Sequence, residues 1–225
     1  MKSGYIAALL LVGLSLCVPV AHAAETAIPL NETLTNGDFS KPLTQGWATQ
    51  ANDIVGDHRI TATQESCAIV LKMMCGNATL VQEVELITTN LNFSTRARFS
   101  PLATKRDYYA TASVLLGFLD SDGKQLGETR IYSAAGTPPW KASNTSHLIA
   151  VTDIGKWHDY SLNLGEELRT NLKGVDPAKV KRLRISLESF CSGEYVCCGF
   201  HLLAEVSAKY VKLEPVSTRT GKGAQ

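Results

Sequence analysis

Alternation of apolar and polar side chains at every second position is the feature of this sequence that most constrains its fold. Residues 91–99 read Leu-Asn-Phe-Ser-Thr-Arg-Ala-Arg-Phe, with apolar or small side chains at the odd positions and polar ones at the even positions. The same pattern recurs in residues 158–164 and 183–189. Because successive side chains of a β-strand point to opposite faces, each segment predicts a strand with one buried and one solvated face, as in antiparallel sheets.

Turn-forming residues separate further segments of this kind along most of the chain. Additional strands are expected near residues 34–39, 58–63, 68–74, 79–87, 109–120, 126–133, 147–152 and 199–213. Only residues 165–174 favour a helix, and that helix would be short. This many strands predicts an all-β fold, an antiparallel two-sheet β-sandwich or jelly roll, in which two sheets bury their apolar faces against each other.

Residues 1–23 have the features of a signal peptide. Lys2 supplies a positive start, an apolar run covers residues 5–20, and Ala-His-Ala at residues 21–23 offers a cleavage site. The apolar run is short and broken by Pro19, which favours a cleaved signal over a retained membrane anchor. We therefore expect a secreted or extracytoplasmic protein without membrane insertion, one domain over residues 24–213, and a disordered tail over residues 214–225.

The charge balance and the lack of catalytic motifs narrow the function. The chain has 22 basic and 21 acidic residues, and removal of Lys2 with the signal peptide leaves 21 of each. A neutral protein gives no electrostatic reason to bind nucleic acid. The sequence contains no Gly-x-Ser-x-Gly elbow, no His-Glu-x-x-His and no phosphate-binding glycine loop, so no enzyme class is indicated.

Five cysteines remain after the expected cleavage. In an exported chain cysteines are disulfide candidates, and their spacing here fits no zinc site. A strand over residues 68–74 would hold Cys67 about 25 Å from Cys75, which is too far for a disulfide. The candidates are Cys75, Cys191, Cys197 and Cys198, joined either within the 191–198 loop or from Cys75 to that loop.

Eight short segments follow one another in an order typical of one protein family. They are residues 36–39 (Asn-Gly-Asp-Phe), 46–47, 68–72, 80–84, 118–123, 157–162, 184–187 and 204–207. In this order, over residues 34–213, the chain resembles the carbohydrate-binding modules of the family four and nine type, which are galactose-binding-domain-like jelly rolls. The resemblance implies a non-catalytic protein that binds a polysaccharide or glycan. The alternatives are a jelly-roll interaction or structural protein without a sugar site, and a jelly-roll enzyme that degrades polysaccharides.

The first of these segments has a physical role of its own. Asn36 and Gly37 form a tight turn that directs Phe39 into the core. Trp47 is expected to pack over that core edge, with its indole N–H bonded locally.

In such modules, aromatic rings stack on sugars while polar side chains bond the hydroxyl groups. Trp140 lies in a proline-rich loop without an obvious core to enter, and is the first candidate. Tyr108 and Tyr109 begin a strand, so that one of them must face outward. Trp157 is a further candidate, although it begins a strand and its role in the family is mostly structural. Polar strand faces that could line a groove, or could be merely solvated, carry Arg96, Arg98, Arg184 and Glu188.

The resemblance also implies a structural calcium between the opening turn and the last strand. Asn36, Asp38 and Glu205 are its candidate ligands. Ser40 and Ala204 stand where the family often has acids, and calcium takes six to eight oxygen ligands, so the site is expected to be weak. No other cofactor is expected.

Overall fold

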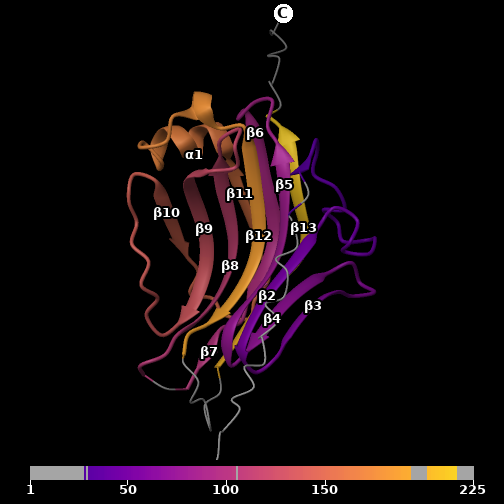
Figure 1. Ribbon diagram of the computed structural model, residues 1–225, viewed down its shortest axis with the longest axis vertical. Coiled ribbons are helices and arrows are strands. Elements are labelled where there is room, and N and C mark those ends of the chain that lie inside the picture. The colour runs from indigo at the N-terminus through magenta and orange to yellow at the C-terminus, as the bar shows by residue number, and fades with distance from the viewer. Residues whose placement is uncertain (1–27, 29, 105, 194–201, 217–225) are drawn as a thin grey trace, which may run out of the picture.

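The chain folds into two β-sheets that pack face to face. The computed structural model describes residues 28, 30–104, 106–193 and 202–216. Figure 1 shows one sheet in front of the other, with the short helix α1 at the upper end. The all-β, two-sheet sandwich predicted from the sequence is confirmed.

Sheet A has the strand order β1-β5-β12-β8-β9-β10, and β2 also pairs with β5. Its short edge pairs, β1 with β5 and β10 with β9, are parallel, and its other pairs are antiparallel. The strands are β1 (Leu30–Asn31), β2 (Ala48–Val55), β5 (Cys75–Glu85), β8 (Ala110–Leu119), β9 (Gln125–Ala135), β10 (Ser146–Ala150) and β12 (Arg182–Cys191).

Sheet B has the order β11-β6-β13-β4-β3, with β7 on β13, and all of these pairs are antiparallel. Its strands are β3 (His58–Ala62), β4 (Ala68–Met73), β6 (Leu91–Phe99), β7 (Leu102–Ala103), β11 (His158–Asn163) and β13 (Leu202–Pro215). Helix α1 (Leu164–Thr170) follows β11, and a 3-10 turn covers Pro177–Lys179. The Asn163 side chain caps α1 by accepting the Glu166 N–H at 2.8 Å.

The alternation of side chains determines which face of each strand is buried. Phe93, Thr95, Ala97 and Phe99 of β6 are buried, and the residues at the positions between them are only partly covered. On β12, Leu183 and Leu187 enter the same hydrophobic core. The prediction from the period of two is confirmed for these strands, and their inward side chains form the interface between the sheets.

The predicted strand over residues 34–39 is wrong, because this stretch is a turn. The N–H of Phe39 donates to the carbonyl of Asn36 at 3.2 Å, and both residues have positive φ angles, of 54° and 48°. Gly37 accepts the N–H of Val211 in β13 at 2.7 Å, and a Cβ at Gly37 would lie 2.2 Å from the Val211 carbonyl oxygen. The glycine thus lets the turn dock directly on sheet B.

The predicted packing of the opening stretch is confirmed. Phe39 and Trp47 are both buried, and their ring centroids lie 5.5 Å apart. The indole N–H of Trp47 donates to the Asn36 carbonyl at 3.1 Å.

The ends of the predicted domain need one adjustment. Strand β13 continues through Pro215, so residues 214 and 215 belong to the last strand, and residues 217–225 of the expected tail lie outside the described part. The predicted signal peptide, residues 1–23, also lies outside it. In the part that the structure describes, no helix has the length and apolarity needed to cross a membrane.

The predicted disulfides are only partly within the described residues. Cys67, Cys75 and Cys191 are buried, and no disulfide joins any of these three to another. Strand β4 separates Cys67 from Cys75, as the sequence predicts. Burial raises the pKa of the Cys191 thiol to about 12. Cys197 and Cys198 lie outside the described residues, so pairing with them stays a prediction.

A buried ammonium group joins the two sheets at the end opposite α1. The side chain of Lys72 in β4 is fully buried, and its Nζ lies 2.9 Å from Oδ1 of Asp53 in β2. The same Nζ donates to the carbonyls of Val55, Asp57 and Met73 at 3.2, 3.3 and 3.0 Å. Lys72 of sheet B therefore bonds β2 of sheet A through two oxygen atoms, those of Asp53 and Val55, while the Asp57 and Met73 carbonyls complete its surroundings.

Candidate functional site

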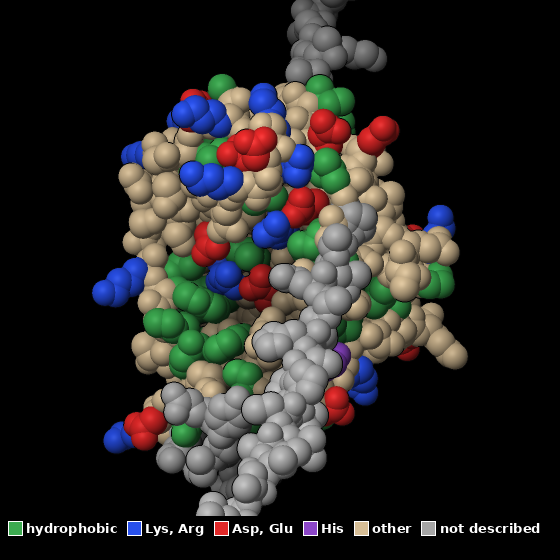
Figure 2. Space-filling view, viewed as in Figure 1, with side chains coloured by type: hydrophobic (Ala, Val, Ile, Leu, Met, Phe, Trp, Pro, Cys, Tyr) green, Lys and Arg blue, Asp and Glu red, His purple; other side chains and the backbone are tan. Residues whose placement is uncertain are grey.

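The outer face of sheet A contains a hollow of about 330 Å³ that we call the polar hollow. Register places Thr79, Glu188 and Ser113 side by side on β5, β12 and β8, and the next outward row contains Asn77, Phe190 and Thr111. Figure 2 shows hydrophobic side chains gathered over this side of the face, next to a group of charged ones. The lining residues are Asn77, Thr79, Tyr109, Thr111, Arg130, Trp140, Glu188, Ser189 and Phe190.

An ion pair forms part of the lining. Nη1 of Arg130, in β9, donates to Oε2 of Glu188 at 2.6 Å and to Oγ of Ser113 at 3.0 Å. The Arg130 side chain is only 11% exposed, and its Nε is buried without a hydrogen-bond partner. Ser113 on the adjacent strand β8 and Glu188 on β12, one strand further, thus hold the guanidinium in one orientation.

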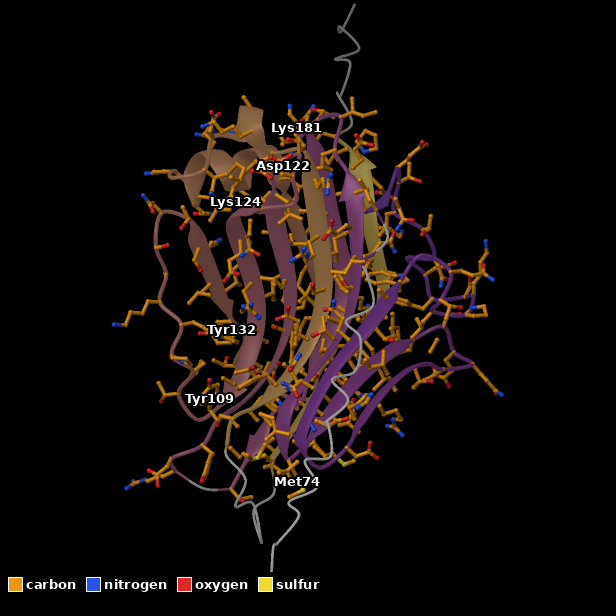
Figure 3. All side chains as sticks on the ribbon, in the orientation of Figure 1. Met74, Tyr109, Asp122, Lys124, Tyr132 and Lys181 are labelled. Carbon is orange, nitrogen blue, oxygen red and sulfur yellow. The ribbon has the colours of Figure 1, made fainter. Side chains whose placement is uncertain are left out.

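Aromatic rings surround this ion pair. The Arg130 guanidinium lies over the ring of Trp140, 4.4 Å from its centroid, and Tyr132 meets Trp140 edge to face at 5.2 Å. Tyr109 stacks on Phe190 with ring centroids 5.5 Å apart. Figure 3 shows Tyr109 and Tyr132 toward the same end of sheet A. The arrangement offers flat apolar surfaces and charged hydrogen-bonding groups within one hollow.

The backbone after β9 explains how Trp140 reaches the hollow. Strand β9 ends at Ala135, and Gly136 adopts a φ of 83°. A Cβ at Gly136 would lie 2.5 Å from the carbonyl oxygen of Tyr108, so the chain turns there only with glycine. The following Pro-Pro pair precedes Trp140, whose ring returns over Arg130 of the strand that has just ended.

A second ion pair lies on the same face. Arg184 of β12 donates from Nε and Nη2 to Oε1 of Glu83 in β5, at 2.9 and 2.6 Å. This second pair joins the adjacent strands β12 and β5, whereas the Arg130–Glu188 pair reaches from β9 across β8 to β12.

The structure brings two of the predicted ligand-binding residues together. Trp140 and Tyr109 both line the polar hollow, together with Glu188. Tyr108 packs in the other direction, against the small buried cluster that includes Ala110 and Cys191. This agrees with the expectation that only one of the two tyrosines faces outward.

The other predicted residues lie on the outer face of sheet B and cannot join this hollow. Arg98 of β6 lies 5.2 Å over the ring of Trp157 and bonds Glu205 at 2.9 Å. Arg96 bonds Asp159 at 3.1 Å. The prediction of one groove is therefore wrong for the set of Arg96, Arg98, Arg184 and Glu188. Strand β6, which carries the first two, belongs to sheet B, and β12, which carries the other two, belongs to sheet A.

The three candidate calcium ligands do not come together. The Asn36 side chain donates to the Lys41 carbonyl at 3.0 Å, and Asp38 accepts the Ser40 hydroxyl at 2.9 Å. Glu205 lies six residues before Val211, the β13 residue that contacts this turn, or roughly 20 Å along the strand. Among the described residues, no three His, Cys, Asp or Glu side chains gather as a metal site.

Six residues that line the hollow were not identified as binding candidates from the sequence, among them Thr79, Thr111 and Ser189. The other three are Asn77, Arg130 and Phe190. Arg130 alone carries a signal, because an arginine within a central strand must find partners for its charge. Which partners it finds depends on the order of the strands.

No protein-family profile and no curated protein matches this sequence. Among solved structures, the chain is similar to a family 4 carbohydrate-binding module, with 11% identity, a TM-score of 0.40, and 80% of this chain and 98% of that chain covered. It is also similar to the family 11 module from Clostridium thermocellum in complex with a mixed-linked tetrasaccharide (10% identity, TM-score 0.42, 82% and 95% covered). A third is the family 11 xylanase from Neocallimastix patriciarum (6% identity, TM-score 0.40, 76% and 100% covered). Likenesses this distant carry no conclusion about function.

Proposed function

We propose that this chain is an exported, non-catalytic protein that binds a polysaccharide or glycan in the polar hollow. The observation that supports the proposal is the grouping of Trp140, Tyr109 and Phe190 around the Arg130–Glu188 pair. A sugar ring has an apolar face, which stacks on aromatic rings, and a rim of hydroxyl groups, which need charged or polar partners. The hollow offers both within one space of about 330 Å³.

The Arg130–Glu188 pair suits hydroxyl recognition because it is already ordered. The guanidinium has five N–H donors and the carboxylate about four acceptor sites, so their mutual bond leaves capacity on both groups. A side chain held in place before the ligand arrives loses little conformational entropy on binding. Hydroxyl groups add bonds to such a pair without separating the charges.

The same pairing favours binding over hydrolysis. A glycosidase needs one carboxylic acid that donates a proton to the leaving oxygen and a second carboxylate that acts as base or nucleophile. On this face Glu188 accepts from Arg130 and Glu83 accepts from Arg184, both at 2.6 Å. Each of these acids is an acceptor toward arginine, which is the opposite of a proton donor.

The test uses a panel of plant, fungal and bacterial polysaccharides and two matched tryptophan variants. Both tryptophans have an arginine over the ring, Trp140 on sheet A and Trp157 on sheet B. We expect the purified protein to be retarded by at least one polysaccharide in affinity electrophoresis. Trp140→Ala should weaken that binding about tenfold or more, equal to ~1.4 kcal/mol, whereas Trp157→Ala should leave it unchanged.

Several results would contradict the proposal. A folded wild-type protein that binds nothing on the panel would exclude glycan binding in favour of an interaction or structural protein. If the two tryptophan variants lost polysaccharide binding equally, the polar hollow would not be the binding site. Release of new reducing ends or unsaturated products from the bound polysaccharide would show an enzyme instead.

A further inference from the structure

A second hollow, of about 370 Å³, lies beside the polar hollow, and we call it the apolar hollow. Its lining includes Ala134, Pro138, Val151 and Ile154, together with Tyr132 and the exposed threonines Thr137 and Thr152. None of the residues that line it is charged, whereas the polar hollow contains both Arg130 and Glu188. The two hollows therefore fit different chemical groups.

One pair of aromatic rings separates the two hollows. Tyr132 lines the apolar hollow, Trp140 lines the polar hollow, and their ring centroids lie 5.2 Å apart. Both rings belong to the β9 strand or to the loop that follows it, and Figure 3 shows Tyr132 on this part of sheet A. A ligand stacked against Trp140 would thus have the apolar hollow next to it.

The strand pattern explains why this space is open. The pairing of β10 with β9 ends at Ala150 and Tyr132, but β9 continues to Ala135. Beyond that point the chain leaves sheet A, since the N–H of Gly155 donates to the Phe99 carbonyl of sheet B at 2.8 Å. The apolar hollow lies in the gap between the continuing β9 and the departing segment.

Exposed apolar surface marks this hollow as a place for a ligand. The Ile154 side chain is 51% exposed at its lining, although the chain has a core that takes most of its large aliphatic residues. Exposed apolar residues gathered at a concave surface are typical of binding sites. A bare sugar is covered with hydroxyl groups, and it would not need a hollow without a charged or amide partner.

We propose that the apolar hollow is a second subsite of the same binding face, and that it receives an apolar ester group, acyl or aryl, carried by the bound polysaccharide. The inference rests on the proposed function, because the sugar chain must first lie in the polar hollow. The ester group would extend past the Tyr132–Trp140 pair and contact Ile154 and Val151. Its carbonyl oxygen would lie near the side chains of Thr137 and Thr152.

The test compares one polysaccharide in two forms. Acetylated or feruloylated xylan and acetylated glucomannan are each compared with the same polymer after mild alkali, which removes the esters and keeps the backbone. For the polymer that binds, we expect the wild-type protein to prefer the esterified form roughly fivefold, an effect on the scale of burying one small apolar group. Ile154→Asp should abolish this preference and leave the binding of the alkali-treated polymer unchanged.

The control variant is Ile87→Asp, since Ile87 is fully exposed and lies between β5 and β6 rather than at either hollow. It should keep both the binding and the preference.

Thr152→Arg, at a second exposed position in the lining, should block the ester preference if Ile154→Asp fails to fold. Equal binding of the esterified and alkali-treated forms by wild type, or a preference that survives both substitutions, would overturn the subsite while the proposed function stands. Absence of binding to either form of every polymer would overturn both.

Discussion

Lys72 and Arg130 are both buried cations, yet their surroundings differ in one decisive way. The Lys72 ammonium bonds three backbone carbonyls and one carboxylate, and its side chain has no exposed surface. The Arg130 guanidinium bonds only side chains, those of Glu188 and Ser113, and lines an open hollow under the ring of Trp140. One cation is enclosed by the backbone, whereas the other is held beside an opening.

This difference distinguishes a cation that stabilises the fold from a cation that can also bind a ligand. Backbone carbonyls cannot move away or find water without unfolding their segments, so Lys72 is part of the connection between the sheets. Glu188 is 25% exposed and keeps access to water, so a ligand can form hydrogen bonds with the Arg130–Glu188 pair. The comparison predicts that the same substitution has different consequences at the two positions.

The largest effect is expected for Lys72→Met. It leaves three carbonyl oxygens without their donor. Since a buried acceptor left unsatisfied costs about 1–3 kcal/mol, a total loss of about 3–5 kcal/mol is expected even though the Asp53 carboxylate, one third exposed, regains hydration. For a chain of this size the melting temperature should fall by roughly 10 °C, measured by calorimetry or by circular dichroism. A loss below ~1 kcal/mol would show that the enclosed ammonium is not structural.

Arg130→Met makes the same chemical change at the second cation. The loss of stability should be smaller, about 1–2 kcal/mol, because Glu188 regains its hydration once the arginine is gone. Binding to the polysaccharide identified by the panel should be lost, which calorimetric titration would detect. If Arg130→Met cost as much stability as Lys72→Met, Arg130 would be a structural cation as well.

The carboxylate beside Lys72 should make stability depend on pH. Burial alone would raise the pKa of Asp53, but hydrogen bonds from Lys72 and His58 outweigh it and hold the pKa below its ordinary value. A lowered pKa in the folded state stabilises the fold above the unfolded value near 3.9, and this stabilisation is lost as the pH falls through the folded pKa. Denaturant unfolding of wild type and Asp53→Asn should therefore differ most at neutral pH and converge below about pH 4. A difference that stayed constant between pH 7 and pH 3 would contradict this role.

The smallest effect is expected at the outer end of the same chain of charges. Nδ1 of His58 lies 2.6 Å from Oδ2 of Asp53, and both side chains are about one third exposed. Exposed ion pairs contribute about 0.2–1 kcal/mol. His58→Gln should thus lower the free energy of unfolding by no more than that, and higher salt should reduce the difference where the imidazole is protonated. A loss comparable to that of Lys72→Met would mean that the histidine, rather than the lysine, holds this corner.

The sequence by itself predicted that two sheets pack face to face, because the alternation of apolar and polar residues along a strand shows which side chains point inward. In residues 91–99 the buried set follows directly from the period of two. The prediction from sequence failed where a tertiary contact determines the backbone conformation. Residues 36–39 form a turn rather than the predicted strand, and this turn contacts Val211 of β13. The prediction also missed β2, because Ala48–Val55 has no apolar alternation and pairs only along one side, with β5.

The candidate site shows the same division more sharply. Trp140 and Trp157 look alike in the sequence, and the period of a strand says only that a residue faces outward, not from which sheet. The order of the strands placed Trp140 with Arg130, Glu188 and Tyr109 in one hollow, and placed Trp157 with Arg98 on the opposite side of the molecule. Periodicity is a local property that each strand carries alone, whereas a site requires neighbours that only the pairing of distant strands brings together.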